Sequence, residues 1–191
     1  MRTTLLKVWG WFLDLIRMRR YLIFDMDGVL VNTYEDEDYM EKLDKKNFFL
    51  WCRPYYKMVE AVRIFREKHP DCGFAICSKP MDNDWCGVEK YAWVNTYTPW
   101  FKPIILVPQS ENKSEFIKKI IKSKRLYVFD DYTYNCVELL MSRIFRLVIK
   151  VKNHINCKKG TWDGPILDIV NSPVTEIVAN MERLIYGKTF P

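Results

Sequence analysis

The fold is decided by one stretch, YLIFDMDGVLVN, which spans residues 21–32. Its apolar start, residues 21–24, has no polar alternation, which is typical of a strand buried on both faces of a parallel sheet. Two carboxylates, Asp25 and Asp27, follow at once, and Gly28 allows the chain to turn sharply behind them. Ligands of open α/β sheets bind beyond the carboxyl ends of the strands. We therefore expect Asp25 and Asp27 to lie in a functional site at that edge.

Four more short apolar runs follow along the chain, and segments with helical spacing separate them. Strands alternating with helices predict an α/β fold, a three-layer doubly wound parallel sheet of Rossmann-like type. Connections in such a fold are right-handed, so that all strands share one carboxyl edge. Residues 152–171 are rich in Lys, Asn and Gly and are expected to form a loop. The expected further strands are residues 72–77, 104–107, 126–129 and 145–151, and the expected helices lie near residues 54–68, 85–94, 113–121, 136–141 and 172–185.

Length and composition limit the class of protein. A chain of 191 residues is most simply one domain with a substantial core. The net charge of +6 suits an anionic substrate and does not by itself imply a nucleic-acid partner. No apolar run approaches the roughly 20 residues of a membrane-spanning helix. The six cysteines are scattered without a CxxC pair, so that we expect reduced thiols in a cytoplasmic protein and no zinc site.

The N-terminal segment, residues 1–20, is basic and carries Trp9, Trp11 and Phe12. Its apolar residues recur with helical spacing, so that we expect a basic, aromatic helix ahead of a core domain over residues 21–191. Such a helix would pack on the domain or on a second copy, which would make a homodimer. The alternative is a helix that lies in a membrane interface, because basic and aromatic residues share one short segment. The pattern of a signal peptide is not found.

The carboxyl edge of the predicted sheet would collect polar residues from separate stretches. Phosphoryl transfer needs a carboxylate nucleophile, a second carboxylate to protonate the leaving oxygen, and hydroxyl and ammonium groups to hold phosphoryl oxygens. Mg²⁺ prefers oxygen ligands such as carboxylates. Lys113 is the lysine expected to hold a phosphoryl oxygen, and Lys102 is the alternative. The residues expected together at this edge are Asp25, Asp27, Ser78, Lys113, Asp130 and Asp131.

Four motifs resemble those of the haloacid dehalogenase-like superfamily. DMDGVL after an apolar strand resembles its first motif, and ICSKP resembles its second, with Ser78 as the phosphate-binding hydroxyl. Lys113 resembles the third-motif lysine, and VFDD resembles the fourth motif, with Asp130 and Asp131 as acids at the metal. The phosphate-hydrolysing members carry an acid at the position of Asp27, so that the resemblance implies phosphatase chemistry rather than dehalogenation.

Longer stretches are similar to the 5'(3')-deoxyribonucleotidase family: NFFLWCRPYYKMVEAV, FAICSKP followed by CGVEKYAWV, and VFDD. By this resemblance Asp25 is the nucleophile and Asp27 is the general acid and base. The resemblance also implies a magnesium ion held by the side chain of Asp25, the backbone carbonyl of Asp27, and Asp130 or Asp131. The residues implied to bind substrate are Ser78, Lys79, Lys113, Phe48 and Phe49.

The helical cap is where the chain departs from that family. Only fifteen residues lie between Asn32 and Phe48, which is too few for such a cap. We therefore expect a minimal cap segment at about residues 33–50, in which Phe48 and Phe49 keep part of the substrate pocket.

Three functional hypotheses remain open at this point. The first is a magnesium-dependent phosphomonoesterase that converts a nucleoside monophosphate to nucleoside and phosphate through an aspartyl-phosphate. The second is a phosphatase on a larger substrate, such as a nucleic-acid end, contacted by Lys150, Lys152, Lys158 and Lys159. The third is a binding module that kept the fold without catalysis, against which the intact acids argue.

Overall fold

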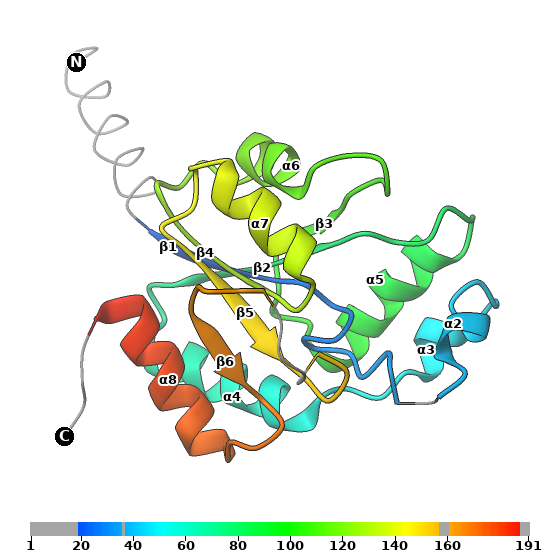
Figure 1. The fold of residues 1–191 in the computed structure, drawn as a ribbon, viewed down its shortest axis with the longest axis horizontal. Helices are drawn as coiled ribbons and strands as arrows, with labels where there is room; N and C mark the ends of the chain where they lie inside the picture. The colour runs from blue at the N-terminus through cyan, green and yellow to red at the C-terminus, as the bar shows by residue number, and fades with distance from the viewer. Residues whose placement is uncertain (1–18, 36, 157–160, 188–191) are drawn as a thin grey trace, which may run out of the picture.

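A parallel sheet forms the centre of the molecule (Figure 1). The computed structural model describes residues 19–35, 37–156 and 161–187. The sheet has six strands in the order β3-β2-β1-β4-β5-β6, which is the order of a doubly wound Rossmann-like fold. The predicted α/β class is thereby confirmed. The strands are β1 (Arg20–Phe24), β2 (Gly73–Ser78), β3 (Ile104–Leu106), β4 (Arg125–Asp130), β5 (Leu147–Lys152) and β6 (Ile166–Asp168).

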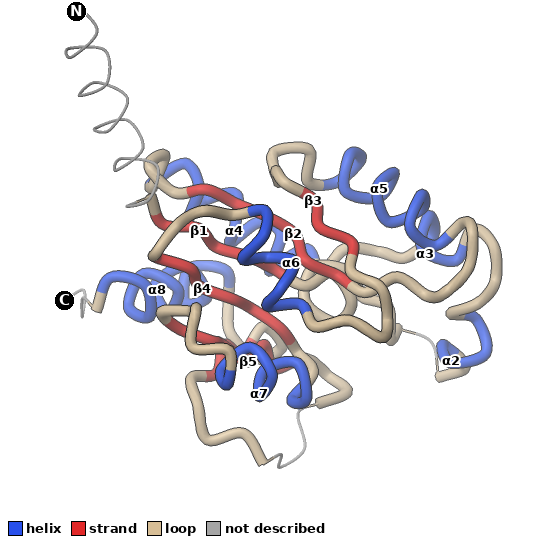
Figure 2. The backbone as a smooth tube through the Cα atoms, turned by 90° about the horizontal axis from the view of Figure 1, so that it is seen from above, coloured by secondary structure: helices blue, strands red, loops and turns tan. Residues whose placement is uncertain are grey.

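Helices cover both faces of the sheet and complete three layers (Figures 1 and 2). On one face α4 packs against α8, and on the other α6 packs against α7. The short helices α2 and α3 lie near α5, and α3 packs directly on α5. The helices are α2 (Tyr39–Lys42), α3 (Phe48–Trp51), α4 (Tyr56–Lys68), α5 (Cys86–Tyr97), α6 (Lys113–Ile120), α7 (Thr133–Met141) and α8 (Val174–Tyr186).

Strand β1 is buried on both faces, as its apolar sequence predicts. Leu22 and Phe24 belong to the core beneath α4 and α8, whereas Ile23 belongs to the core beneath α6 and α7. Successive side chains of a strand point to opposite faces, so a two-sided strand must be apolar at every position. The ring of Phe24 stacks on Phe129 of β4 with centroids 4.5 Å apart.

The register of β1 places the ends of its neighbours beside Asp25. Phe24 is the partner of Ile76 in β2 and of Phe129 in β4, and all three strands are parallel. The chain crosses from β3 on one side of β1 to β4 on the other, so that a switch in strand order lies between β1 and β4. A crevice outside the carboxyl ends is the expected ligand site at such a switch.

Three expectations need correction or lie outside the structure. Residues 152–171 are not all loop, because Ile166–Asp168 forms edge strand β6, whose three residues are too few for a sequence pattern. Strand β1 begins at Arg20, one residue before the apolar run that predicts it. The helix expected within residues 1–20, its homodimer and its membrane contact fall on undescribed residues, apart from Arg19 and Arg20.

The described residues include five of the six cysteines and all of the helices named above. Cys72, Cys77, Cys86 and Cys136 are buried free thiols, Cys52 is buried as well, and Cys157 lies outside the described ranges. None of the described helices combines the length and apolar character that crossing a membrane requires.

Candidate active site

Asp25 stands at the carboxyl end of β1, and its carboxylate is held from both sides. Its backbone N–H donates to the carbonyl of Phe129 at 2.9 Å, which continues the parallel ladder by one residue. Oδ1 accepts a hydrogen bond of 2.7 Å from the backbone N–H of Met26. Oδ2 lies 2.8 Å from Lys113 Nζ. The carboxylate is therefore buried and oriented before any substrate arrives.

Lys113 joins two of the predicted acids. It begins helix α6, is 1 % exposed, and places Nζ 2.8 Å from Asp25 Oδ2 and 2.7 Å from Asp130 Oδ2. Burial lowers the pKa of a lysine, but the carboxylates of Asp130 and Asp25 outweigh it and hold the pKa of Lys113 well above its ordinary value. The structure thus brings Lys113 to the place predicted for it.

Three carboxylates form a cluster around this lysine. Asp25, Asp130 and Asp131 each offer an oxygen, and these atoms lie within 4.8 Å of one another. Burial raises the pKa of Asp130 to about 6. Burial, together with the nearby carboxylates of Asp130 and Asp25, raises the pKa of Asp131 well above its ordinary value. A set of buried oxygen ligands whose charges repel one another suits a hard divalent cation such as Mg²⁺.

Two loops hold Asp131 in place. Gly28 adopts φ +69°, and a Cβ there would collide with the Asp131 carboxylate and lie 2.7 Å from Asn153 Nδ2. The fully buried Asn153 donates from Nδ2 to the carbonyl of Gly28 at 2.9 Å and to Asp131 Oδ2 at 2.8 Å. Asn156 Nδ2 donates to the backbone carbonyl of Asp131 at 2.9 Å. Sequence reasoning missed both asparagines, because they lie in a polar segment without periodicity.

Asp27 has a separate environment from the three clustered acids. Its Oδ1 accepts a hydrogen bond of 2.9 Å from Thr33 Oγ1, and its Oδ2 contacts the ammonium of Lys90. Its side chain is 21 % exposed, more than that of Asp25. Asp27 therefore lies beside the cluster and has its own hydrogen-bonding partners. Its expected metal contact was through the backbone carbonyl, and this remains a prediction.

Lys90 is the principal residue that sequence reasoning missed. Its ammonium contacts Asp27, donates to Ser78 Oγ at 3.0 Å, and lies 4.4 Å from the centroid of the Phe49 ring. The side chain is fully buried. A signal was present in the sequence, since position 90 falls between Cys86 and Trp93 on the buried face of α5. A lysine on a buried face must have ionic or polar partners.

Helix α5 also anchors the cap segment. The buried carboxylate of Glu89 accepts hydrogen bonds from the backbone N–H of Asn47 at 2.5 Å and of Phe49 at 3.2 Å. Trp93 Nε1 donates to the carbonyl of Cys52 at 2.8 Å. These hydrogen bonds attach α3 and the residues on either side of it to α5.

The acids open into a cavity of about 440 Å³. Its wall includes Lys79, whose Nζ donates to the Gln109 carbonyl at 3.2 Å. Ser78 is fully buried beneath Lys90 and does not line the cavity. Phe48 lines a neighbouring hollow with Trp51 rather than this cavity, and its predicted part in substrate binding stays a prediction. The cavity is lined by Asp25, Asp27, Thr33, Tyr34, Leu43, Phe49, Lys79, Met81, Gln109, Lys113, Asp131, Tyr132, Tyr134 and Asn135.

Several other lysines have roles different from those considered for them. Lys150 is buried and donates to Thr133 Oγ1 at 2.5 Å, and Lys152 forms an ion pair of 2.8 Å with Asp168. Lys102 lines a hollow with Arg19, Trp100 and other residues near the amino end of β2, far along the strand from the acids. Lys102 is therefore excluded as the lysine of the site. Lys158 and Lys159 lie outside the described residues.

Comparison with known proteins supports the fold and goes no further. Neither a protein-family model nor a curated protein matches the chain. A solved structure from Burkholderia xenovorans LB400, described as a haloacid dehalogenase-like hydrolase, is similar with a TM-score of 0.55 and 7% identity. The match covers 84% of this chain and 98% of that chain. The likeness shows that the two chains share a fold.

Proposed function

We propose that the protein is a magnesium-dependent phosphomonoester hydrolase that works through an aspartyl-phosphate on Asp25, with a nucleoside monophosphate as its substrate. One observation carries the proposal. Lys113 bridges Asp25 and Asp130, and Asp131 offers a third oxygen within 4.8 Å of theirs. A non-catalytic module would have no reason to keep three buried carboxylates whose burial and mutual repulsion cost stability.

The charge of the centre fits a magnesium ion. The three carboxylates of the cluster, those of Asp25, Asp130 and Asp131, lie with one ammonium group, that of Lys113. The difference is two negative charges, which one divalent cation balances. Asp25, Asp130 and Asp131 would hold the ion. When bound, Mg²⁺ neutralises phosphoryl oxygens and lowers their repulsion of an incoming carboxylate.

The first half-reaction is assigned to Asp25 and Asp27. A carboxylate oxygen of Asp25 attacks phosphorus, the bond from phosphorus to the ester oxygen breaks, and an acyl phosphate forms on Asp25. Asp27 gives its proton to the leaving alkoxide, which departs as an alcohol. In the second half-reaction Asp27 takes a proton from water, and that water attacks phosphorus to release phosphate and regenerate Asp25.

Lys113 would hold a phosphoryl oxygen during these steps, whereas the fully buried Lys90 would fix the carboxyl group of Asp27. Lys113 lines the cavity beside Asp25, and Lys90 lies between Asp27 and Ser78. The ammonium group of Lys113 is fixed by packing, so that it stabilises developing charge without reorganising first. Lys79 at the cavity wall is a further cation for the substrate phosphate.

The size and lining of the cavity support a nucleotide-sized substrate. A volume of about 440 Å³ lies within the range of small-molecule sites. Phe49, Tyr34, Tyr132 and Tyr134 bring aromatic rings to the wall, where a planar base could stack. Burial, and the carboxylates of Asp131, Asp27 and Asp25, raise the pKa of Tyr34, so that its hydroxyl stays protonated as a donor.

A phosphate-release assay with Mg²⁺ tests this function. The substrates are deoxy- and ribonucleotides with 5' or 3' phosphates, with a phosphorylated oligonucleotide as the larger alternative. We expect release from mononucleotides that stops in EDTA, and a loss of about 10⁴-fold or more in Asp25→Asn. Asp44→Asn, an exposed acid of the cap segment, is the matched control and should keep full activity. Normal turnover by Asp25→Asn would contradict the mechanism, and faster release from the oligonucleotide would contradict the substrate.

A further inference from the structure

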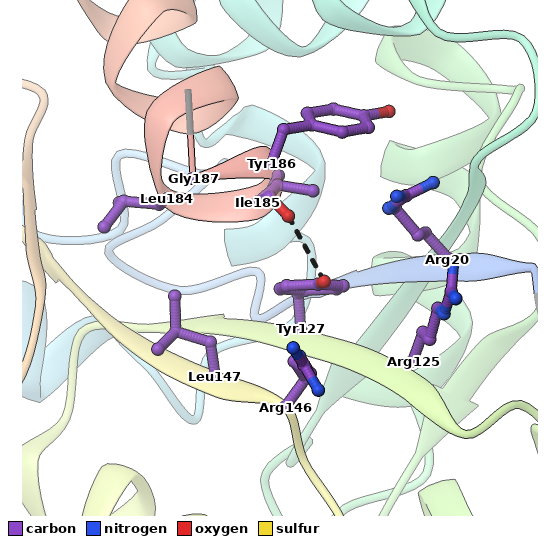
Figure 3. Close-up of a pocket in the computed structure, with 9 residues that line it drawn as sticks. All are labelled: Arg20, Arg125, Tyr127, Arg146, Leu147, Leu184, Ile185, Tyr186 and Gly187. Atoms are coloured by element: carbon purple, nitrogen blue, oxygen red, sulfur yellow. Dashed lines mark hydrogen bonds between the residues drawn. The ribbon is translucent and has the colours of Figure 1, made fainter. Parts of the chain in front are cut away.

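A second cavity lies at the opposite edge of the sheet and is lined by arginine. It has a volume of about 410 Å³ and is bounded by the amino ends of β1, β4 and β5 and by the last turn of α8 (Figure 3). Arg20 precedes Asp25 by five residues along β1, which at roughly 3.3 Å per residue is about 16 Å. We call this cavity the arginine pocket. Its lining residues are Arg20, Arg125, Tyr127, Arg146, Leu147, Leu184, Ile185, Tyr186 and Gly187.

Strand register brings the arginines together. Arg20 and Arg125 are register partners at the first positions of β1 and β4, and side chains of register partners point to the same face. Arg146 immediately precedes β5, and its backbone N–H donates to the carbonyl of Leu126. Figure 3 shows the three arginines around one hollow, with the Tyr186 ring next to the guanidinium group of Arg20.

These guanidinium groups have little compensation. The pocket lining contains no acid. Within the described residues, Arg125 and Arg146 have no ion pair or side-chain hydrogen bond. Arg20 Nε is buried without a hydrogen-bond partner, although Arg20 Nη1 lies 3.5 Å from Asp71 and the guanidinium lies 4.5 Å from the Tyr186 centroid. Three unneutralised or partly neutralised cations in one concavity repel one another.

The carboxyl end of helix α8 does not neutralise the three arginines of the pocket. A helix carboxyl terminus carries about half a negative charge, which could attract one cation but not three. The carbonyl of Ile185 accepts its hydrogen bond from Tyr127 Oη at 3.3 Å, and Gly187 caps the helix with φ +67°. Across the described ranges, none of the three guanidinium groups donates to a carbonyl of α8. The positive charge of these guanidinium groups is thus available to an anionic ligand.

We propose that the arginine pocket binds the phosphate group of a phosphorylated ligand. Guanidinium groups match phosphate through paired N–H···O bonds, and three of them can neutralise a doubly charged oxyanion. Tyr186, Leu147 and Leu184 supply an aromatic and apolar wall for the organic part of the ligand. The phosphate belongs either to a free phosphate ester or to a lipid headgroup. This site is separate from the acids at the other edge and does not depend on the function proposed for them.

Calorimetry with inorganic pyrophosphate, on the full chain in EDTA, tests the pocket. The test variant is Arg125→Ala with Arg146→Ala, because neither side chain is an ion-pair partner within the structure. The matched control is Lys122→Ala with Lys124→Ala, which removes the same charge from exposed residues near that edge. We expect affinity to fall by about 100-fold in the arginine variant, from the loss of two charge-assisted contacts. The lysine variant should lose less than threefold.

Two further measurements ask where pyrophosphate binds and whether the natural phosphate group belongs to a free ester or to a lipid. Lys79→Ala, at the cavity beside Asp25, is the location arm, and a loss of pyrophosphate affinity there as large as that of the arginine variant would overturn the assignment. Sedimentation with phosphatidic acid vesicles, against phosphatidylcholine vesicles, tests the lipid headgroup. Pyrophosphate binding without vesicle binding supports a free phosphate ester, and vesicle binding that needs Arg125 and Arg146 supports the headgroup. Equal losses in the arginine and lysine variants, or no binding in either arm, would overturn the proposal.

A conservative variant guards against misfolding. Arg125→Lys with Arg146→Lys keeps the charge and the aliphatic stems but removes the paired donors. We expect the melting temperature of wild type and an affinity between wild type and the alanine variant. Full pyrophosphate affinity in the protein that carries Arg125→Lys and Arg146→Lys would overturn recognition by guanidinium groups.

Discussion

The two edges of one sheet carry opposite charge in this molecule. Strand β1 begins with Arg20 and is followed by Asp25, and β4 begins with Arg125 and ends with Asp130. Parallel strands place like ends side by side, so that the charges of neighbouring strands add at each edge rather than cancel. The carboxyl edge therefore becomes acidic and the amino edge basic.

The two edges differ in how their charge is compensated. At the carboxyl edge, Lys113 and Lys90 are fully buried and contact three of the acids. At the amino edge, Arg125 and Arg146 lack ion-pair partners among the described residues, and both remain partly exposed to solvent. A buried charge must have its partner within the protein, whereas a partly exposed charge can wait for a ligand. Substitutions at the two edges should therefore differ in their cost to stability.

The largest difference is expected from removing one cation at each edge. Lys113→Met leaves the carboxylates of Asp25 and Asp130 buried without their shared partner, which should lower the free energy of unfolding by about 3–5 kcal/mol. Arg146→Ala should change it by less than about 0.5 kcal/mol, because its guanidinium has no partner to lose. Urea denaturation in EDTA measures both. Equal effects would show that the two edges are not compensated differently.

A smaller effect is expected from the asparagine that positions Asp131. Asn153→Ala removes the two hydrogen bonds by which Asn153 links Asp131 Oδ2 to the Gly28 carbonyl, so that Asp131, the proposed magnesium ligand, loses its orientation. We expect the Mg²⁺ concentration for half-maximal activity to rise about 10–100-fold, with a smaller change in kcat at saturating Mg²⁺.

The control for that prediction is another asparagine at the same edge. Asn171 is exposed and hydrogen-bonds Asp168 rather than Asp131. Asn171→Ala should leave the magnesium requirement unchanged. A rise in both variants, or a fall in kcat alone for Asn153→Ala, would argue against orientation of a metal ligand.

The smallest effect is expected from neutralising one acid of the cluster. A carboxyl group whose pKa is raised by folding lowers stability at neutral pH, because the folded protein must hold a proton there or bear a disfavoured charge. Asp131→Asn should therefore raise the melting temperature in EDTA by a few degrees. Addition of Mg²⁺ should raise the melting temperature of wild type and not that of the variant. A magnesium-independent wild type would contradict the site.

The sequence predicts the carboxyl edge well because its signals are local. Apolar runs followed directly by acids identify Asp25, Asp130 and Asp131, and the helix start identifies Lys113. Parallel topology then brings them together without further information. Edge strand β6 could not be predicted, since three residues whose pairing depends on β5 carry no period.

The residues that were missed depend on contacts across the fold. The place of Lys90 between Cys86 and Trp93 indicates a buried lysine, but its partners Asp27 and Ser78 come from distant parts of the chain and only the fold identifies them. Asn153 lies in a polar loop, and only its closeness to Gly28 and Asp131 gives it a role. Phe48 and Phe49 line different hollows, because adjacent residues of one helical turn point in different directions.

Detection of a covalent phosphate on Asp25 is the most direct test of the proposed mechanism. Wild type and Asp25→Asn are incubated with Mg²⁺ and a radiolabelled nucleoside monophosphate, quenched in acid and digested. Mass spectrometry and hydroxylamine sensitivity then locate any acyl phosphate. We predict a hydroxylamine-labile phosphate on the peptide that contains Asp25 in wild type, absent in EDTA and in Asp25→Asn. Phosphate release by wild type without this adduct, or an adduct on another residue, would contradict the account.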